Sequence, residues 1–314
     1  MLEKNTVKYK QKKILIVGSG RWSKEILNEL LNIFIKKKNI FLFTNKKKNK
    51  YLQDKFSIKQ IKNFSQIKKE KITHTIVCNK TSKHYETFKN LKKYRTDILI
   101  EKPLTNQDTQ NFKIFKFSKK SKNLICLSSQ LYFSNFFLYL KKFLIKKNFK
   151  VKKIIFKWYD QKNEIRKGSK KSQNTAIKYV IDVFYHFNSI LNFLRNNKKA
   201  GNTIINNLYY KKNEIYFDLF GISIFMHTNR NSKDRKRQIE IYNKKNQVIK
   251  VNFKKVPKFS YNNYKYDFKK LDKCLSNQLK TFLSDDLRRK KDILVRNKEN
   301  LFINLKILNN KVKK

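Results

Sequence analysis

A glycine-containing turn near the start of the chain has the composition of a phosphate-binding loop. It follows a continuous apolar run at residues 14–17, precedes a helical pattern of apolar residues, and holds two of the chain's five glycines. Gly18 permits a tight turn, and Gly20 lets a diphosphate approach the free N–H groups at the helix start. Ser23 occupies the third position, where a small residue usually allows close helix–strand packing. The alternative is an ordinary strand–helix turn. The residues predicted to contact a nucleotide cofactor here are Gly18, Ser19, Gly20, Arg21 and Trp22.

The residues after the next apolar run, at positions 40–43, bear on the choice of cofactor. An NAD site usually has an acidic residue at the end of its second strand, where the carboxylate binds the ribose 2′-hydroxyl. Here the run is followed by Thr44, Asn45 and Lys46, none of which is acidic. Asn45 and Lys46 could hold a 2′-phosphate, although Lys46 could equally be one more surface lysine. We therefore expect NAD or NADP as cofactor, with a slight preference for NADP.

Lys102 is the first candidate for proton transfer. It lies between Glu101 and Pro103 at the end of an apolar run at residues 98–100, and ligands bind at the carboxyl ends of strands in doubly wound sheets. A lysine acts as a base near neutral pH only if burial or a nearby cation lowers its pKa from about 10.4. Pro103 stiffens the backbone after the lysine, and Glu101 could pair with it or hold a cofactor ribose. The alternative is one solvated lysine among 77 basic residues.

Asp182 and His186 form the second candidate pair. They are four residues apart in an apolar helical segment at 179–194, so they share one helix face. Their neighbours include three aromatic residues, which makes a packing helix with a satisfied core histidine the alternative. A metal site is not predicted, because His74, His84, His186 and His227 show no ligand spacing.

The pattern of elements predicts two domains. The first part alternates strands with helices, which indicates a parallel, doubly wound sheet with helices on both faces; its strands are expected at 14–17, 40–43, 75–78, 98–100 and 124–127. We also expect its first helix to carry Phe34 on its apolar face. We place the Rossmann domain at residues 1–127.

Residues 128–314 are expected to form an α+β domain with a mostly antiparallel sheet. A strand at 151–158 and the helix at 179–194 precede strand-like runs at 203–210, 214–219, 222–227, 237–242 and 248–253. Two helices, around 271–283 and 299–308, are expected to close the chain.

The formal net charge of +55 suggests a nucleic-acid binder at first sight. The excess is mostly lysine, spread along the whole chain and accompanied by Asn, Ile, Phe and Tyr, which share A- and T-rich codons. A base-biased genome explains this composition, so we expect no specific nucleic-acid partner. Three scattered cysteines, a polar start without a signal peptide and no apolar run of membrane-spanning length indicate a cytoplasmic protein without a membrane partner.

Four motifs together resemble the Gfo/Idh/MocA oxidoreductases, the family of glucose–fructose oxidoreductase and inositol dehydrogenase. Besides the glycine turn, residues 101–103 resemble the family's EKP motif, residues 77–84 its loop with a histidine before a helix, and residues 182–186 its DxxxH helix. Their order and separations fit, and the resemblance covers most of the chain. One departure is the segment 175–178, where family members often carry glycines.

The resemblance implies an activity: an NAD(P)-dependent oxidoreductase that exchanges hydride with a secondary alcohol of a sugar, sugar nucleotide or cyclic polyol. It implies that the cofactor binds in the first domain and the carbohydrate in a cleft between the domains. Members of the family often form homo-oligomers through the open face of the second sheet, which here implies a dimer or tetramer. The implied catalytic residues are Lys102, which would touch substrate hydroxyl and nicotinamide, His186 as proton acceptor or relay, and Asp182, which would bind a substrate hydroxyl or orient the imidazole. Further cofactor contacts would come from Asn79, His84, Glu101 and Lys102.

Trp158 and Arg166 are candidate substrate contacts. Trp158 could offer an aromatic face to a sugar ring, and Arg166 could bind a carboxylate or phosphate. Core packing at a strand end is an equally good explanation for Trp158. Two other functions stay open: a non-catalytic relative that binds a nucleotide or sugar, and a basic nucleic-acid-binding protein.

Overall fold

A computed structural model of the chain divides it into two compact units. The first contains the residues up to Phe133 and a C-terminal segment that begins at Leu275; the second contains Ser134–Cys274. The structure describes residues 11–44, 56, 58–162, 165–166, 169–170, 178–194, 205–211, 213–254, 256–268 and 272–286. The helix expected around 299–308 lies outside these residues.

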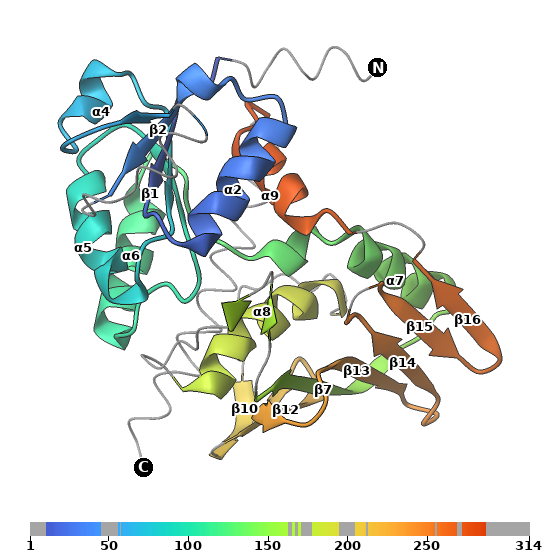
Figure 1. Ribbon diagram of the computed structural model, residues 1–314. Helices are drawn as coiled ribbons and strands as arrows, with labels where there is room; N and C mark the ends of the chain where they lie inside the picture. The colour runs from blue at the N-terminus through green and yellow to red at the C-terminus, as the bar shows by residue number, and fades with distance from the viewer. Residues whose placement is uncertain are drawn as a thin grey trace. The chain divides into compact units, whose positions relative to one another are not determined.

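The first unit is built on a six-stranded parallel sheet with the order β3-β2-β1-β4-β5-β6 (Figure 1). Its strands are β1 (Ile14–Val17), β2 (Ile40–Phe43), β3 (Lys59–Gln60), β4 (His74–Val77), β5 (Asp97–Ile100) and β6 (Ile125–Leu127). The helices are α2 (Arg21–Asn32), α4 (Gln66–Lys69), α5 (Thr81–Leu91), α6 (Asp108–Lys120) and α9 (Cys274–Phe282), with short 3₁₀ turns at Lys37–Asn39 and Gln130–Phe133. The predicted parallel Rossmann sheet is confirmed.

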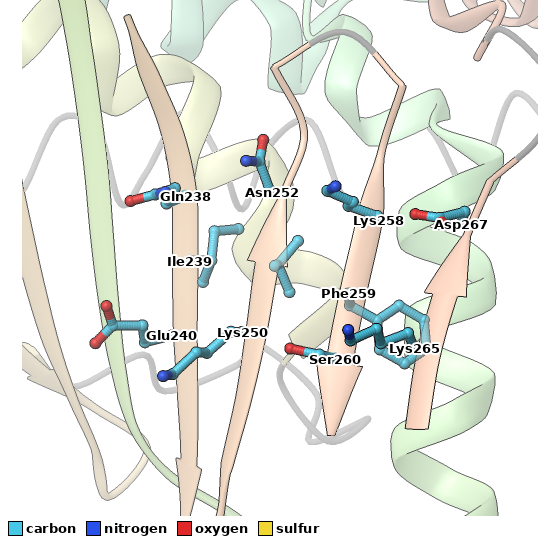
Figure 2. A pocket seen from close by; sticks show the side chains of 11 residues that line it. Gln238, Ile239, Glu240, Lys250, Asn252, Lys258, Phe259, Ser260, Lys265 and Asp267 are labelled. Atoms are coloured by element: carbon cyan, nitrogen blue, oxygen red, sulfur yellow. The ribbon is translucent and has the colours of Figure 1, made fainter. Parts of the chain in front are cut away.

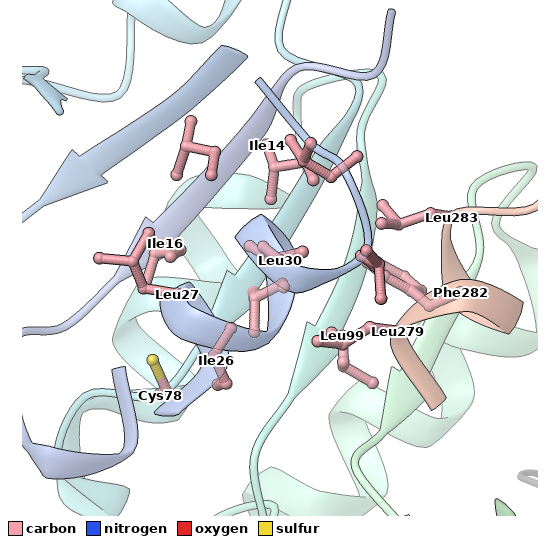
Figure 3. Close-up of a cluster of buried hydrophobic side chains, with 14 of the residues drawn as sticks. Ile14, Ile16, Ile26, Leu27, Leu30, Cys78, Leu99, Leu279, Phe282 and Leu283 are labelled. Carbon is pink, nitrogen blue, oxygen red and sulfur yellow. The ribbon is translucent and has the colours of Figure 1, made fainter. Parts of the chain in front are cut away.

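One core of this unit lies between the sheet, α2 and α9. Ile26 and Leu30 of α2 pack with Ile14 and Ile16 of β1 and with Leu279 of α9, all of them buried (Figure 3). Helix α9 thus belongs to the first unit, although a division at residue 127 assigns it to the second domain. Its apolar side chains join the core that α2 and the sheet form, so residues far apart in the chain build this unit together.

Helix α2 ends earlier than its apolar pattern suggests. The N–H of Ile35 donates to the carbonyl of Leu30 (3.1 Å) and that of Phe34 to Leu31 (3.0 Å), and Phe34 has a left-handed φ of 70°. This is a Schellman ending, in which glycine is usual at the left-handed position. The prediction that Phe34 packs on the helix's apolar face is therefore wrong: its side chain is 62% exposed.

Replacing Phe34 by glycine should stabilise the first unit by about 1 kcal/mol, because glycine adopts the left-handed conformation without strain. Phe34→Ala also removes the aromatic ring but keeps a Cβ in the left-handed conformation, so its free energy of unfolding should increase much less. Urea unfolding of both variants measures the difference. Equal stabilities of the glycine and alanine variants would contradict this account of the helix end.

The second unit is an eight-stranded mixed sheet with the order β10-β11-β12-β7-β13-β14-β15-β16, in which only the β7–β12 pairing is parallel. The strands are β7 (Val151–Gln161), β10 (Ile205–Lys211), β11 (Glu214–Leu219), β12 (Ile222–Ser232), β13 (Lys236–Asn243), β14 (Val248–Asn252), β15 (Lys258–Tyr261) and β16 (Tyr264–Asp267). A separate hairpin joins β8 (Ile165–Arg166) to β9 (Ser169–Lys170). The expected mostly antiparallel sheet is confirmed.

Helices α7 (Asn135–Lys146) and α8 (Tyr179–Leu194) pack on one face of this sheet. The ring of Phe187 in α8 lies 4.4 Å from that of Phe156 in β7, and Phe193 lies 6.1 Å from Phe137 in α7. Sequence analysis assigns no element to α7, β15 and β16. The signal for α7 is nevertheless present: Ser134 caps the helix by accepting a hydrogen bond from the N–H of Phe137.

Candidate functional site

The glycine turn is formed where three neighbouring strands of the first unit end. The N–H of Gly18 donates to the carbonyl of Phe43 at the end of β2 (2.9 Å), and the N–H of Cys78 donates to Val17 at the end of β1 (2.9 Å). Gly18 has a φ of +123°, and a Cβ there would lie 2.7 Å from the backbone nitrogen of Asn79. A glycine is therefore required at this position both by backbone conformation and by the close approach of the next loop.

Gly20 opens helix α2 without capping it. Its φ of −76° and ψ of −177° are extended, no side chain caps the helix, and the first turn contains no acidic residue. No atom lies within 4 Å of the place where a Cβ of Gly20 would be. Exposed N–H groups at a helix start beside open space suit an anionic diphosphate. The residues of this turn thus fit the dinucleotide that the sequence analysis assigns to them.

Ser23 takes the place of the third small residue of the motif. It is 1% exposed, and its hydroxyl lies 3.2 Å from the thiol of Cys78, just after β4. This polar pair seats α2 against the sheet. Arg21 is exposed at the start of the helix, whereas Trp22 is half-buried and packs against the core between α2 and the sheet.

The end of β2 is tied to the glycine turn through Thr44, whose hydroxyl donates to the hydroxyl of Ser19 (3.0 Å). The side-chain amide of Gln60 donates to the carbonyl of Thr44 (3.3 Å). Asn45 and Lys46, the residues on which the NADP preference rests, lie outside the described residues.

His84 joins the loop after β4 to the loop after β5. It is 1% exposed, its Nε2 lies 3.1 Å from the carbonyl of Asn79, and its Nδ1 lies 3.1 Å from those of Pro103 and Leu104. Burial lowers the pKa of His84, against the opposing effect of these carbonyls. The imidazole thus holds two site loops together through backbone atoms. The side chain of Asn79 is held by Thr87, whose hydroxyl accepts from its amide (2.8 Å).

Glu101 and Lys102 follow β5 in the second of these loops. Glu101 is buried and Lys102 half-buried, and the peptide bond between Lys102 and Pro103 is cis. Burial raises the pKa of Glu101, while Ser128, Trp22 and Lys102 oppose the shift. Strands β1, β4 and β5 are neighbours in the parallel sheet, so the turn after β1 and the loop after β5 begin at the same edge. The glycine turn and Glu101-Lys102 therefore occupy one edge of one sheet.

The raised pKa of Glu101 predicts a pH dependence of stability. Because the folded-state pKa lies above the ordinary value of about 4.3, the associated stability is present below that value and is lost as pH rises through the folded-state pKa. Glu101→Gln should therefore unfold at a higher temperature than wild type at neutral pH, by about 2–4 °C for each kcal/mol, and match it in acid. Thermal unfolding between pH 4 and pH 8 tests this.

Glu86→Gln is the matched control for this measurement. Glu86 is exposed, and its hydrogen bond with Lys83 lowers the pKa of its carboxyl group. Its replacement should bring no gain at neutral pH. If the difference in unfolding temperature between Glu101→Gln and wild type were the same at pH 4 and pH 8, the ionised carboxylate of Glu101 would not be destabilising.

Asp182 and His186 lie on α8 in the second unit, and both are half-buried. The imidazole of His186 stacks on the indole of Trp158 with ring centroids 4.9 Å apart and planes 7° apart. Trp158 is thus engaged within the protein, and its ring also contacts the guanidinium of Arg237, whose Cζ lies 3.8 Å from the ring centroid. These ring contacts agree with the core-packing alternative for Trp158, and its role as a sugar-binding face stays a prediction. Arg166 lies in the β8–β9 hairpin.

Sequence analysis missed the buried ion pair behind Trp158. Arg237 is 2% exposed and Asp160 5%, and Nη2 of Arg237 donates to Oδ1 of Asp160. Asp160 follows Trp158 by two residues, but nothing in the sequence indicates that Arg237, 77 positions after Asp160, lies opposite Trp158 in the sheet. Strand register alone brings them together.

In the described part of the chain, no group of three or more His, Cys, Asp or Glu side chains could hold a metal ion. Among the described residues, no helix has both the length and the apolar character needed to cross a bilayer.

A pocket of about 370 Å³ lies on the outer strands of the second sheet (Figure 2). Buried Ile239, Val251 and Phe259 contribute to its lining, together with mostly polar and charged residues of β13 to β16. None of the candidate residues above lines it, so we do not assign the reaction to this pocket.

Comparisons with known proteins find one family model and a set of similar folds. Residues 12–128 match the model of the family named GFO_IDH_MocA, described as an oxidoreductase family with an NAD-binding Rossmann fold. No curated protein matches the sequence.

Solved structures share the fold over nearly the whole chain. UDP-N-acetylglucosamine 3-dehydrogenase GnnA from Acidithiobacillus ferrooxidans is 11% identical, with a TM-score of 0.71 over 94% of this chain and 96% of that one. KijD10, a 3-ketoreductase from Actinomadura kijaniata solved with NADP and TDP-benzene, is 11% identical, with a TM-score of 0.66 over 91% and 94%. A Gfo/Idh/MocA family oxidoreductase from Vibrio cholerae is 11% identical, with a TM-score of 0.69 over 97% and 100%. The glycine turn and the Glu101-Lys102-Pro103 loop both lie within the matched segment, and residues 12–128 are thus similar to the NAD-binding Rossmann domain of Gfo/Idh/MocA oxidoreductases.

Proposed function

We propose that the protein is an NAD(P)-dependent oxidoreductase that exchanges hydride with a secondary alcohol of a sugar, sugar nucleotide or cyclic polyol. The observation that carries the proposal is the meeting of two features at one edge of the first sheet. An uncapped glycine turn follows β1, and Glu101-Lys102 follows β5, with His84 holding the loop between them in place. The turn suits a dinucleotide, and the lysine suits proton transfer to or from its substrate.

The residues proposed to hold the cofactor are those of the turn and the adjacent loops. Gly18 shapes the turn, the backbone N–H groups from Ser19 to Trp22 would face the diphosphate, and Asn79 and Glu101 border the same edge of the sheet. When bound, the nicotinamide supplies hydride exchange. Whether NAD or NADP is preferred depends on the residues after β2, and our proposal of a slight NADP preference rests on Asn45 and Lys46.

Lys102 is proposed to handle the substrate proton. It takes the hydroxyl proton when the alcohol is oxidised and returns it when the ketone is reduced. The buried Glu101 beside it supplies negative charge whenever it is ionised, and Pro103 restricts the backbone that carries the lysine. His186 and Asp182 are proposed as a proton relay and a hydroxyl-binding group in the second unit.

The substrate class is proposed from the same comparison. The neighbours named above include a dehydrogenase of a UDP-sugar and a ketoreductase solved with a TDP derivative. A panel of UDP- and TDP-sugars, free sugars and inositols, assayed with all four nicotinamide cofactors by absorbance, tests the proposal. Turnover of at least one class supports it, whereas cofactor binding without turnover of any would favour a non-catalytic relative.

We further propose a homo-oligomer, a dimer or tetramer, and a reducing compartment. The face of the second sheet opposite α7 and α8 carries the polar side chains of β13 to β16 seen in Figure 2 and is available to a second copy. Free thiols at Cys78, Cys126 and Cys274 support the reducing compartment. Light scattering of the purified protein measures the oligomeric state.

A further inference from the structure

We propose that Arg237 is a positioning residue for His186: it holds the indole of Trp158, and the indole in turn holds the imidazole in one orientation. The inference rests on the proposed role of His186 in proton transfer. It adds a residue to the machinery that no sequence motif indicates.

The strand register brings Arg237 to Trp158. In the antiparallel pairing of β13 with β7, Arg237 lies directly opposite Trp158, so both side chains project from the same face of the sheet. The guanidinium carbon lies 3.8 Å from the centroid of the indole ring, which is within the range of a cation–π contact. Trp158 lies under α8, where its ring stacks on His186.

Arg237 is itself held firmly. Its Nη1 donates to the carbonyls of Tyr159 (2.6 Å) and Lys236 (2.7 Å), and its Nη2 donates to the buried carboxylate of Asp160. Both charged side chains are at least nine-tenths buried, and removing either alone would leave an uncompensated charge. A planar guanidinium can stack on a ring and form these in-plane hydrogen bonds at once, which an ammonium group cannot.

The contacts of Arg237 with Trp158 and of Trp158 with His186 hold the imidazole by its face. Stacking engages the face of the imidazole, whereas Nδ1 and Nε2 project in the ring plane and are not part of this contact. A proton relay needs such an arrangement, because an imidazole misplaced by about 1 Å can cost about 10²-fold in rate. The buried ion pair thus acts on His186 through one aromatic ring.

The test replaces the pair together, so that no buried charge is left alone. In Arg237→Met/Asp160→Asn the side chains keep similar volumes, and such replacements of buried ion pairs are often tolerated. Arg230→Met is the matched control. Arg230 packs on another aromatic ring, that of Tyr179 in α8, with its Cζ 4.6 Å from the ring centroid. Both variants lose one arginine from the same unit.

NMR of the imidazole protons supplies a readout that does not depend on activity. The chain has four histidines, and His186→Gln identifies the His186 signals. In wild type, the ring current of the indole should shift these signals upfield of those of His227, whose imidazole pairs with Glu214. In the double variant they should move toward the His227 position and broaden, while kcat falls about tenfold and the KM for cofactor stays unchanged.

The outcomes separate this inference from the proposed function. Unchanged His186 signals in the double variant, or shifted signals with an unchanged kcat, would overturn the positioning role of Arg237. An effect of the same size in Arg230→Met would also overturn it. Wild-type protein that shows the upfield signals but turns over no substrate would instead refute the proposed function, and with it the need for a positioned imidazole.

Discussion

Lys102→Ala should lower kcat by about 10²–10⁴-fold, the contribution typical of a general acid–base, and should leave cofactor affinity within about threefold of wild type. We expect kcat and cofactor affinity to respond differently because of where the Lys102 side chain lies. The glycine turn that binds the diphosphate is built from backbone atoms around β1, and none of those atoms depends on the Lys102 side chain. Steady-state kinetics with the best substrate of the panel, together with fluorescence titration of NADH and NADPH, measure both quantities.

Two further variants separate proton transfer from charge. Lys102→Arg keeps the positive charge but carries a group that does not lose its proton in proteins, so it should be nearly as inactive as the alanine variant. Lys122→Ala removes an exposed lysine just before β6 and should leave kcat unchanged. An active Lys102→Arg enzyme would show that Lys102 contributes charge alone, and a fully active Lys102→Ala enzyme would refute its catalytic assignment.

The two glycines of the turn should fail in different ways when replaced by alanine. At Gly18, a φ of +123° and a Cβ 2.7 Å from the nitrogen of Asn79 require backbone movement. Gly18→Ala should therefore lose about 2–5 kcal/mol of unfolding free energy, from backbone strain and overpacking together, and lose cofactor binding as well. At Gly20 the φ is ordinary and the space is open, so Gly20→Ala should keep the wild-type stability.

Gly20→Ala should nevertheless weaken cofactor binding at least about tenfold, because its methyl group occupies the space through which a diphosphate reaches the helix start. Chemical unfolding without cofactor and titration with cofactor give the two quantities for each variant. If Gly20→Ala bound NADH and NADPH as well as wild type does, the diphosphate would have to lie elsewhere. If Gly18→Ala were as stable as wild type, the close approach of Asn79 would be wrong.

The sequence predicts the strands of the first sheet far better than it predicts where the helices end and which surfaces they pack on. Buried parallel strands appear as continuous apolar runs, and the runs at 14–17 and 40–43 match β1 and β2 residue for residue. The end of α2 was missed because Phe34 occupies a left-handed position where glycine would have marked the stop. The packing of α9 into the first unit is a long-range contact, and local patterns contain no information about it.

In the candidate site, too, residues with a local sequence pattern can be predicted, whereas long-range contacts cannot. Gly18, Gly20, Glu101 and Lys102 could be found because each stands at a strand end with a recognisable local pattern. His84 was found as well, but not its role, since its hydrogen bonds reach backbone carbonyls nineteen and twenty residues away. Arg237 could not be found, because its pairing with Asp160 and Trp158 depends on the register of two distant strands.

Titration of the purified protein with NADH and NADPH tests the central claim most directly. We predict saturable binding of a reduced nicotinamide cofactor, at one site per chain, that is weakened at least about tenfold in Gly20→Ala and retained in Lys102→Ala. Failure of wild-type protein to bind any of NAD⁺, NADH, NADP⁺ and NADPH would contradict the assignment of this chain as a nicotinamide-dependent oxidoreductase.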